Sequence, residues 1–105
     1  MFVVLLRFSA NRSQAGAWMA AHKAWLQRGF DEGVFLASGS LQGQGGGAIL
    51  AWGLDSAALQ RRLAEDPFVV HDIVSAEVVD VALSKADPRL AFLMETRACS
   101  TEVSE

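Results

Sequence analysis

The chain carries two histidines, His22 and His71, and histidine is the side chain best suited to proton transfer near neutral pH. His22 lies in an apolar stretch between Trp18 and Trp25, and this position leaves two interpretations open. In the first, His22 is a buried neutral histidine whose ring nitrogens are satisfied by neighbouring groups. In the second, it is a general acid and base that faces a ligand. A carboxylate against one ring nitrogen would favour the second, because it fixes the tautomer of the imidazole.

No other group of residues forms a metal-binding or phosphate-binding motif. His71 and Asp72 would have to combine with His22 to bind a metal, but this spacing matches no known ligand pattern, and we expect no metal. The glycine-rich run 43–47 lacks the Lys-Ser/Thr ending of a phosphate loop and precedes a strand. It is interpreted as a flexible hairpin, with a mobile lid over a cleft as the alternative.

The hydrophobic pattern predicts helices and strands in the order β-α-β-β-α-β. Apolar residues recur with the period of one helix face, and Gly33 ends this helix. Asp55 is a suitable N-cap for a second helix, which must end near Asp66 because Pro67 disfavours the helical conformation of the residue before it. The expected strands are 2–8, 34–41, 47–52 and 73–83. The first helix is expected to have its N-cap within 11–13 and its inner face at positions 18, 21, 22, 25, 26 and 29. The second helix is expected to begin within 54–59.

This order predicts an α+β, ferredoxin-like subunit with a four-stranded antiparallel sheet and both helices on one face. Strands 2–8 and 47–52 are apolar on both sides, so the opposite face needs cover. A second copy related by a two-fold axis is the simplest cover, and we expect a homodimer through the sheet faces. Residues 1–83 form this domain. Residues 84–105 form a C-terminal extension, in which Asp87-Pro88 starts a short helix that precedes a flexible tail.

Composition narrows the class of protein. The chain has 105 residues, 51% of them hydrophobic, and a net charge of −3, which fits one globular domain and gives no electrostatic reason to expect nucleic acid or an anionic membrane as partner. No apolar run approaches the ~20 residues that span a bilayer, and Met1–Arg7 does not fit a secretory signal, so we expect a cytoplasmic protein. The single cysteine, Cys99, excludes an internal disulfide and a multi-thiolate metal site.

Several segments, taken together in this order, resemble the YCII-related family over about residues 1–83. The segments that carry the resemblance are His22 followed by Trp25-Leu26, the stop at Gly33, Ser38-Gly39-Ser40 within a strand, the glycine-rich hairpin, and Asp66-Pro67-Phe68 before the last strand. The resemblance implies a ferredoxin-like subunit that forms a dimeric α+β barrel, with a histidine and an aspartate close together in a cleft at the dimer interface.

The resemblance also implies a function. Carried over to this chain, the two cleft residues are His22 and Asp66, with no cofactor. A few relatives act on hydroxylated aromatic rings, including dehydrochlorination of a chlorinated hydroquinone. The expected function is therefore acid/base catalysis, of the elimination or isomerisation type, on a small phenolic or chlorinated aromatic substrate. The expected substrate-binding residues are Ser38, Gly39, Ser40 and Phe68.

The alternative is a protein that binds a small ligand without turning it over, or a dimeric accessory domain, in which His22 only packs. A hydrogen bond between His22 and Asp66 beside a cavity would distinguish the enzyme from this alternative. An aspartate at the C-terminal end of the second helix would face the unfavourable end of the helix dipole, which a protonated His22 would offset.

Overall fold

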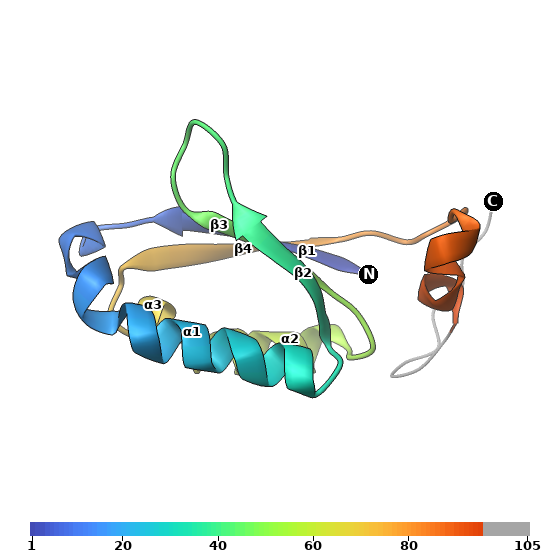
Figure 1. Ribbon diagram of the computed structural model, residues 1–105, viewed down its shortest axis with the longest axis horizontal. Coiled ribbons are helices and arrows are strands. Elements are labelled where there is room, and N and C mark those ends of the chain that lie inside the picture. The colour runs from blue at the N-terminus through green and yellow to red at the C-terminus, as the bar shows by residue number, and fades with distance from the viewer. Residues whose placement is uncertain (96–105) are drawn as a thin grey trace.

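The computed structural model describes residues 1–95, so the expectations for Cys99 and the flexible tail lie outside them. Four strands form one antiparallel sheet in the order β2-β3-β1-β4, and the α-helices lie on one of its faces (Figure 1). This arrangement confirms the predicted α+β, ferredoxin-like fold. The elements are β1 (Phe2–Phe8), η1 (Arg12–Gln14), α1 (Ala15–Asp31), β2 (Phe35–Ser40), β3 (Gly47–Ala51), α2 (Ser56–Leu63), α3 (Pro67–Val70), β4 (Val74–Asp80) and η2 (Pro88–Met94), where η denotes a 3-10 helix.

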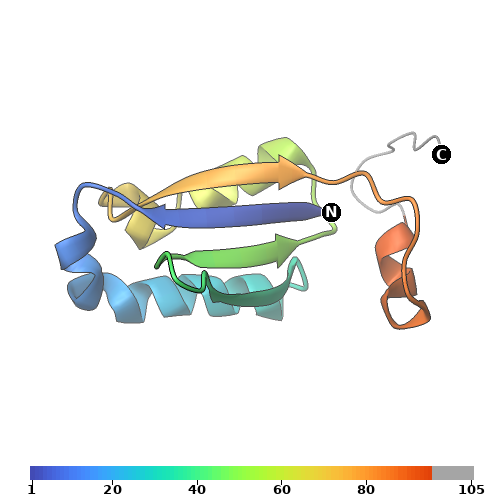
Figure 2. The ribbon, with the colours of Figure 1, turned by 90° about the horizontal axis from the view of Figure 1, so that it is seen from above.

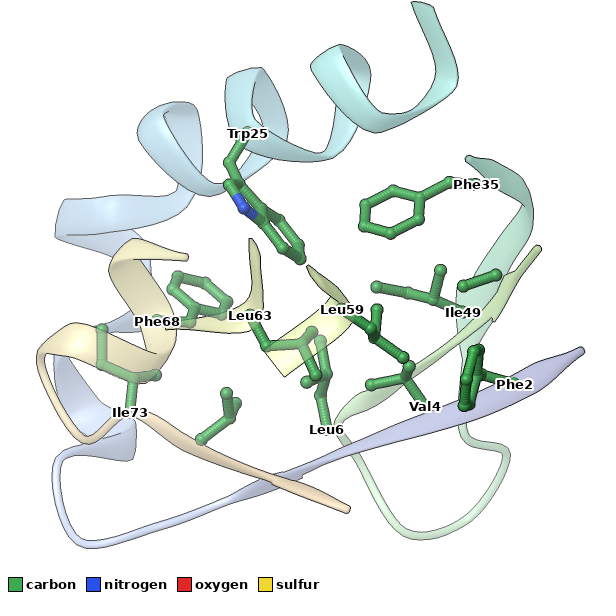
Figure 3. Close-up of a cluster of buried hydrophobic side chains, with 12 residues drawn as sticks. Phe2, Val4, Leu6, Trp25, Phe35, Ile49, Leu59, Leu63, Phe68 and Ile73 are labelled. Carbon is green, nitrogen blue, oxygen red and sulfur yellow. The ribbon is translucent and has the colours of Figure 1, made fainter. Parts of the chain in front are cut away.

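The core lies between the sheet and the helices. Alternate residues of β1 point toward the helix layer and are buried, as the period of a strand requires. Trp25 projects from α1 into this layer and meets the ring of Phe35 edge-on, at 5.3 Å between centroids (Figure 3). Its indole Nε1 donates to the carbonyl of Arg62, which joins α1 to α2. The buried apolar residues are Phe2, Val4, Leu6, Trp25, Phe35, Ile49, Ala51, Leu59, Leu63, Phe68, Ile73 and Val74.

The other face of the sheet carries apolar side chains that the chain does not cover with a helix. Figure 2 shows the sheet from the side of this open face, with β1 and β3 in the middle of the sheet. Val3 of β1 is paired with Leu50 of β3 on one side and with Val79 of β4 on the other, so these three side chains share the open face. Val79 is 41% exposed. Three apolar side chains therefore lie side by side on this face.

The start of α1 differs from the prediction. Asn11 makes no capping hydrogen bond, because η1 intervenes and α1 begins only at Ala15. The side-chain amide of Asn11 donates instead to the carbonyl of His71, 2.9 Å away, and so ties this turn to the segment before β4. Ala21, which was expected on the inner face of the helix, is exposed.

The end of α1 agrees with the prediction. Gly33 has a φ of +76°, the left-handed conformation that glycine adopts without strain. Its N–H donates to the carbonyl of Phe30, and the N–H of Val34 donates to the carbonyl of Gly29. These two bonds form a Schellman motif, which satisfies carbonyls left free at a helix end and turns the chain toward β2.

The second half of the fold contains a helix that the sequence analysis missed. Asp55 caps α2 as predicted, with its carboxylate accepting from the N–H of Ala58 at 2.7 Å, but α2 ends at Leu63. Asp66 then caps a separate short helix, α3, in which Pro67 occupies the first turn. The expectation that Asp66 stands at the C-terminal end of the second helix is wrong, and so is the dipole argument built on it.

The extension beyond β4 forms a 3-10 helix where a short helix was expected. Asp87 caps η2 by accepting from the N–H of Arg89 at 2.9 Å, and Pro88 follows it. Hydrogen bonds from the side chain and backbone of Arg89 lower the pKa of the Asp87 carboxyl. Phe92 meets Trp52 edge-on at 5.2 Å. Among residues 1–95, no helix combines the length and the apolar character needed to cross a membrane.

Candidate functional site

His22 and Asp66 meet in the structure. Asp66 Oδ1 lies 2.8 Å from His22 Nδ1, although the two residues are 44 positions apart in the chain. The His22 side chain is 13% exposed and the Asp66 side chain is completely buried. The ring of Phe68 is stacked on the imidazole, with 4.1 Å between centroids and 6° between planes. The imidazole is therefore held at one edge by a carboxylate and on one face by an aromatic ring.

The backbone of α3 fixes the position of the Asp66 carboxylate. Oδ1 also accepts from the N–H of Phe68 at 3.0 Å, so the atom that caps the helix is the atom that bonds His22. Because Phe68 follows two residues later, one turn of chain supplies both the carboxylate and the ring that stacks on the imidazole. Within residues 1–95, Asp66 Oδ2 is buried and has no hydrogen-bond partner.

This geometry assigns the two nitrogens of the imidazole different roles. When Asp66 is ionised, its carboxylate can only accept hydrogen bonds, and in that state Nδ1 of His22 carries the proton of the shared bond. The neutral ring then has its lone pair on Nε2. A proton taken from a ligand would therefore go to Nε2, while Asp66 stabilises the imidazolium that forms.

A pocket of about 460 Å³ adjoins this pair. In Figure 1, β2 rises away from α1 toward the β2–β3 loop. His22 is in its wall, whereas Asp66 is behind His22 and does not line it. The pocket is lined by Leu6, Phe8, Met19, His22, Lys23, Leu26, Ser38, Gly39, Ser40, Gly45, Gly46, Gly47, Ala48, Ile49, Phe68 and Val74.

All four residues expected to bind substrate line this pocket: Ser38, Gly39, Ser40 and Phe68. Ser38 is paired with Ile49, whose side chain is buried under the helices, so both hydroxyl-bearing residues of β2 face the helix layer. A Cβ at Gly39 would meet nothing within 4 Å, so the described chain leaves the space at this position open.

The sequence analysis missed Met19, Lys23 and Leu26 of α1 as pocket residues. A signal for them was present in the spacing, because positions 19, 22, 23 and 26 share a helix face rotated by about one residue from the buried stripe. His22 belongs to both faces. Its place at their border explains why it is largely buried and yet lines the pocket.

The second histidine lies elsewhere. The ring of His71 is stacked on Trp18 with 3.8 Å between centroids, and His71 is not among the residues that line the pocket. His22, His71 and Asp72 do not come together as metal ligands. Over the part of the chain that the structure describes, no group of three or more His, Cys, Asp or Glu side chains is arranged to hold a metal ion.

Comparison with known proteins gives a match among solved structures. No family model matches the sequence, and no curated protein matches it. Among solved structures, the chain is similar to the 5-chloro-2-hydroxyhydroquinone dehydrochlorinase of Burkholderia phenoliruptrix AC1100 in complex with 2,5-dihydroxybenzoquinone. The TM-score is 0.65 at 14% sequence identity, over 80% of this chain and 96% of that one. At this identity the match establishes a shared fold, and it supports the resemblance to the YCII-related family at the level of the fold.

Proposed function

We propose that this protein is a small, cofactor-independent enzyme of the YCII-related type, which uses His22 as general acid and base and Asp66 to orient it. The observation that carries the proposal is the 2.8 Å contact between His22 Nδ1 and Asp66 Oδ1 at the wall of a pocket of about 460 Å³. A histidine held in this way is suited to take a proton from a ligand and to return it.

The proposed substrate class is a small hydroxylated aromatic ring, with or without chlorine. The pocket offers flat apolar walls from Phe8 and Phe68 and hydroxyls from Ser38 and Ser40, and these suit a planar ring that carries oxygens. The similar solved structure is that of a dehydrochlorinase that acts on such a ring and is bound to a dihydroxybenzoquinone, which supports this choice of class.

The proposed chemistry needs no redox partner. His22 Nε2 takes the proton of a ring hydroxyl and returns it to a ring carbon, which gives the keto tautomer of the substrate. If that carbon bears chlorine, loss of the proton of a second hydroxyl forms another carbonyl, and the displaced electron pair leaves with chloride. The net change is the loss of one HCl. Without chlorine, the first step alone is an isomerisation. A positioned acid/base group accelerates such steps by ~10²–10⁴-fold.

The test is replacement of each histidine in turn. His22→Gln should lower turnover of chlorinated and unchlorinated hydroxyhydroquinones by about 10²–10⁴-fold, measured as chloride release and as the change in ultraviolet absorbance. His71→Gln is the matched control, because it removes the chain's other imidazole, which does not line the pocket.

Two results would contradict the proposal. One is turnover that is unchanged in His22→Gln. The other is tight binding of a ring by the wild-type protein with no turnover of any compound in the panel, which would favour a ligand-binding module.

A further inference from the structure

The charged group in the pocket lining is positive, whereas the net charge of the chain is negative. The chain has 12 acidic and 9 basic residues, yet the pocket lining contains one ammonium group, that of Lys23, and no carboxylate. The carboxylate that bonds a lining residue is that of Asp66, whose Oδ1 is shared between His22 and the N–H of Phe68. The wall that a ligand would meet is therefore positive in an acidic protein.

Lys23 is not engaged elsewhere in the described chain. Among the described lysines and arginines, Arg7 pairs with Glu77, Arg62 with Glu32 and Arg89 with Asp87, whereas the others make no ion pair. Lys23 makes no such ion pair or hydrogen bond within residues 1–95, and it follows His22 directly on the pocket side of α1. Its ammonium group is therefore available to an anion that occupies the pocket next to the imidazole.

A second cation lies behind the pocket wall. The guanidinium of Arg12 is stacked on the ring of Phe8, with its Cζ 4.4 Å from the centroid, and Phe8 lines the pocket. Arg12 also makes no ion pair within the part of the chain that the structure describes. Because the ring of Phe8 screens an electric field only weakly, the guanidinium charge of Arg12 adds to the positive potential inside the pocket.

We propose that the pocket selects aromatic or quinonoid rings that carry an ionised oxygen, and that Lys23 is the residue that binds this oxygen and so determines specificity. This inference rests on the proposed function for the location of the site and adds the charge state of the ligand. The hydroxybenzoquinones belong to this class, because a hydroxyl conjugated through the ring to a carbonyl is a vinylogous carboxylic acid and is ionised at neutral pH.

His22 and Lys23, which are neighbours on α1, then have different roles. An ionised oxygen bound by Lys23 orients the ring, and a different hydroxyl or ring carbon then faces His22. When a proton leaves elsewhere on the ring, further negative charge is delocalised onto the bound oxygen, and the ammonium group of Lys23 stabilises it. Lys23 thus acts on ligand binding and orientation, whereas the proton transfers belong to His22.

The test compares two ligands that differ in charge. The probes are 2,5-dihydroxybenzoquinone, which is an anion at neutral pH, and its dimethyl ether, which has the same ring and no charge. Binding is measured by calorimetry for the wild type, Lys23→Gln, Lys23→Arg and Lys85→Gln. Lys85 is the chain's other lysine and does not line the pocket, so Lys85→Gln matches the change in net charge.

The wild type should bind the anion more tightly than its ether. Lys23→Gln should weaken binding of the anion about tenfold, since a hydrogen bond to a charged group in a partly exposed site contributes at this scale, and should leave binding of the ether unchanged. Lys23→Arg should stay within about threefold of the wild type, because it keeps the charge. Lys85→Gln should match the wild type. Added salt should weaken anion binding in the wild type far more than in Lys23→Gln.

Three results would overturn the inference: equal affinity of the wild type for both probes, failure of both probes to bind, or equal losses in Lys23→Gln and Lys85→Gln. These results are separate from the fate of the proposed enzyme. A Lys23-dependent preference for the anion with no effect of His22→Gln on turnover would keep the inference and reject the enzyme. The reverse pattern would keep the enzyme and reject the inference.

Discussion

Asp66 has a structural role as the cap of α3 and a positioning role toward His22, and different substitutions separate the two. Its Oδ1 caps α3 and bonds His22, and the whole carboxylate is buried. Asp66→Ala should destabilise the fold by about 1–3 kcal/mol, because it removes a helix cap and leaves a largely buried imidazole N–H without its acceptor. Urea unfolding checks this value. A loss below about 0.5 kcal/mol would show that the cap and the buried bond contribute little.

Asp66→Asn tests the positioning role alone. Asparagine caps helices as well as aspartate does, so most of the stability should remain. The amide is neutral and stabilises the imidazolium less than a carboxylate does, so turnover should fall while the protein stays folded. Because the Oδ1 that caps α3 also faces Nδ1, nitrogen NMR of the labelled imidazole should show the same tautomer in the wild type and in Asp66→Asn. Turnover that is unchanged in Asp66→Asn would contradict the positioning role.

At the scale of the element, α1 contains two glycines in opposite environments. Gly29 is buried, and a Cβ on it would overlap the ring of Phe35, whereas a Cβ on Gly16 would meet nothing within 4 Å. Gly29→Ala should therefore destabilise the fold by about 1–3 kcal/mol through overpacking, despite the better helix propensity of alanine. Gly16→Ala should stabilise it by about 0.5 kcal/mol. Thermal unfolding of both variants checks the pair, and equal shifts would contradict the packing at Phe35.

The sequence predicted those elements whose signals are local. The strand at 2–8, the helix stop at Gly33 and the cap at Asp55 each depend on a few adjacent residues, and all three are present. Helix α3 was missed although its signature, Asp66-Pro67, is the one that was interpreted correctly at Asp87-Pro88. Proline ends the conformation before it and favours a helix after it, and only the first effect was applied.

The candidate site needed more than local signals. Periodicity placed His22 on the buried stripe of α1 but said nothing about residue 66, because a contact across 44 positions depends on how α1 packs against α3. The pairing was expected only from the family resemblance. Lys23 lies outside the apolar stripe that periodicity identifies, because the pocket faces the next row of the same helix.

At the scale of the whole molecule, the open face of the sheet remains to be accounted for. Val3, Leu50 and Val79 lie side by side on it, and no helix of the described chain covers them. Burial of these side chains against the same side chains of a second copy is favourable, and a two-fold contact covers the open face of both subunits. We therefore propose that the protein is a homodimer through its sheet faces.

The dimer is tested by placing a charge on each side of the sheet. Val79→Lys puts an ammonium group within the proposed interface and should give a monomer, whereas the wild type should have the mass of two chains by light scattering. Val70→Lys is the control, because Val70 is 60% exposed on α3, in the helix layer, while Val79 is 41% exposed on the open face. A wild-type protein that is monomeric at micromolar concentration, or a dimer that both variants weaken equally, would exclude association through this face. Each monomer would then keep its pocket between α1 and the sheet, so the test of His22 does not depend on this result.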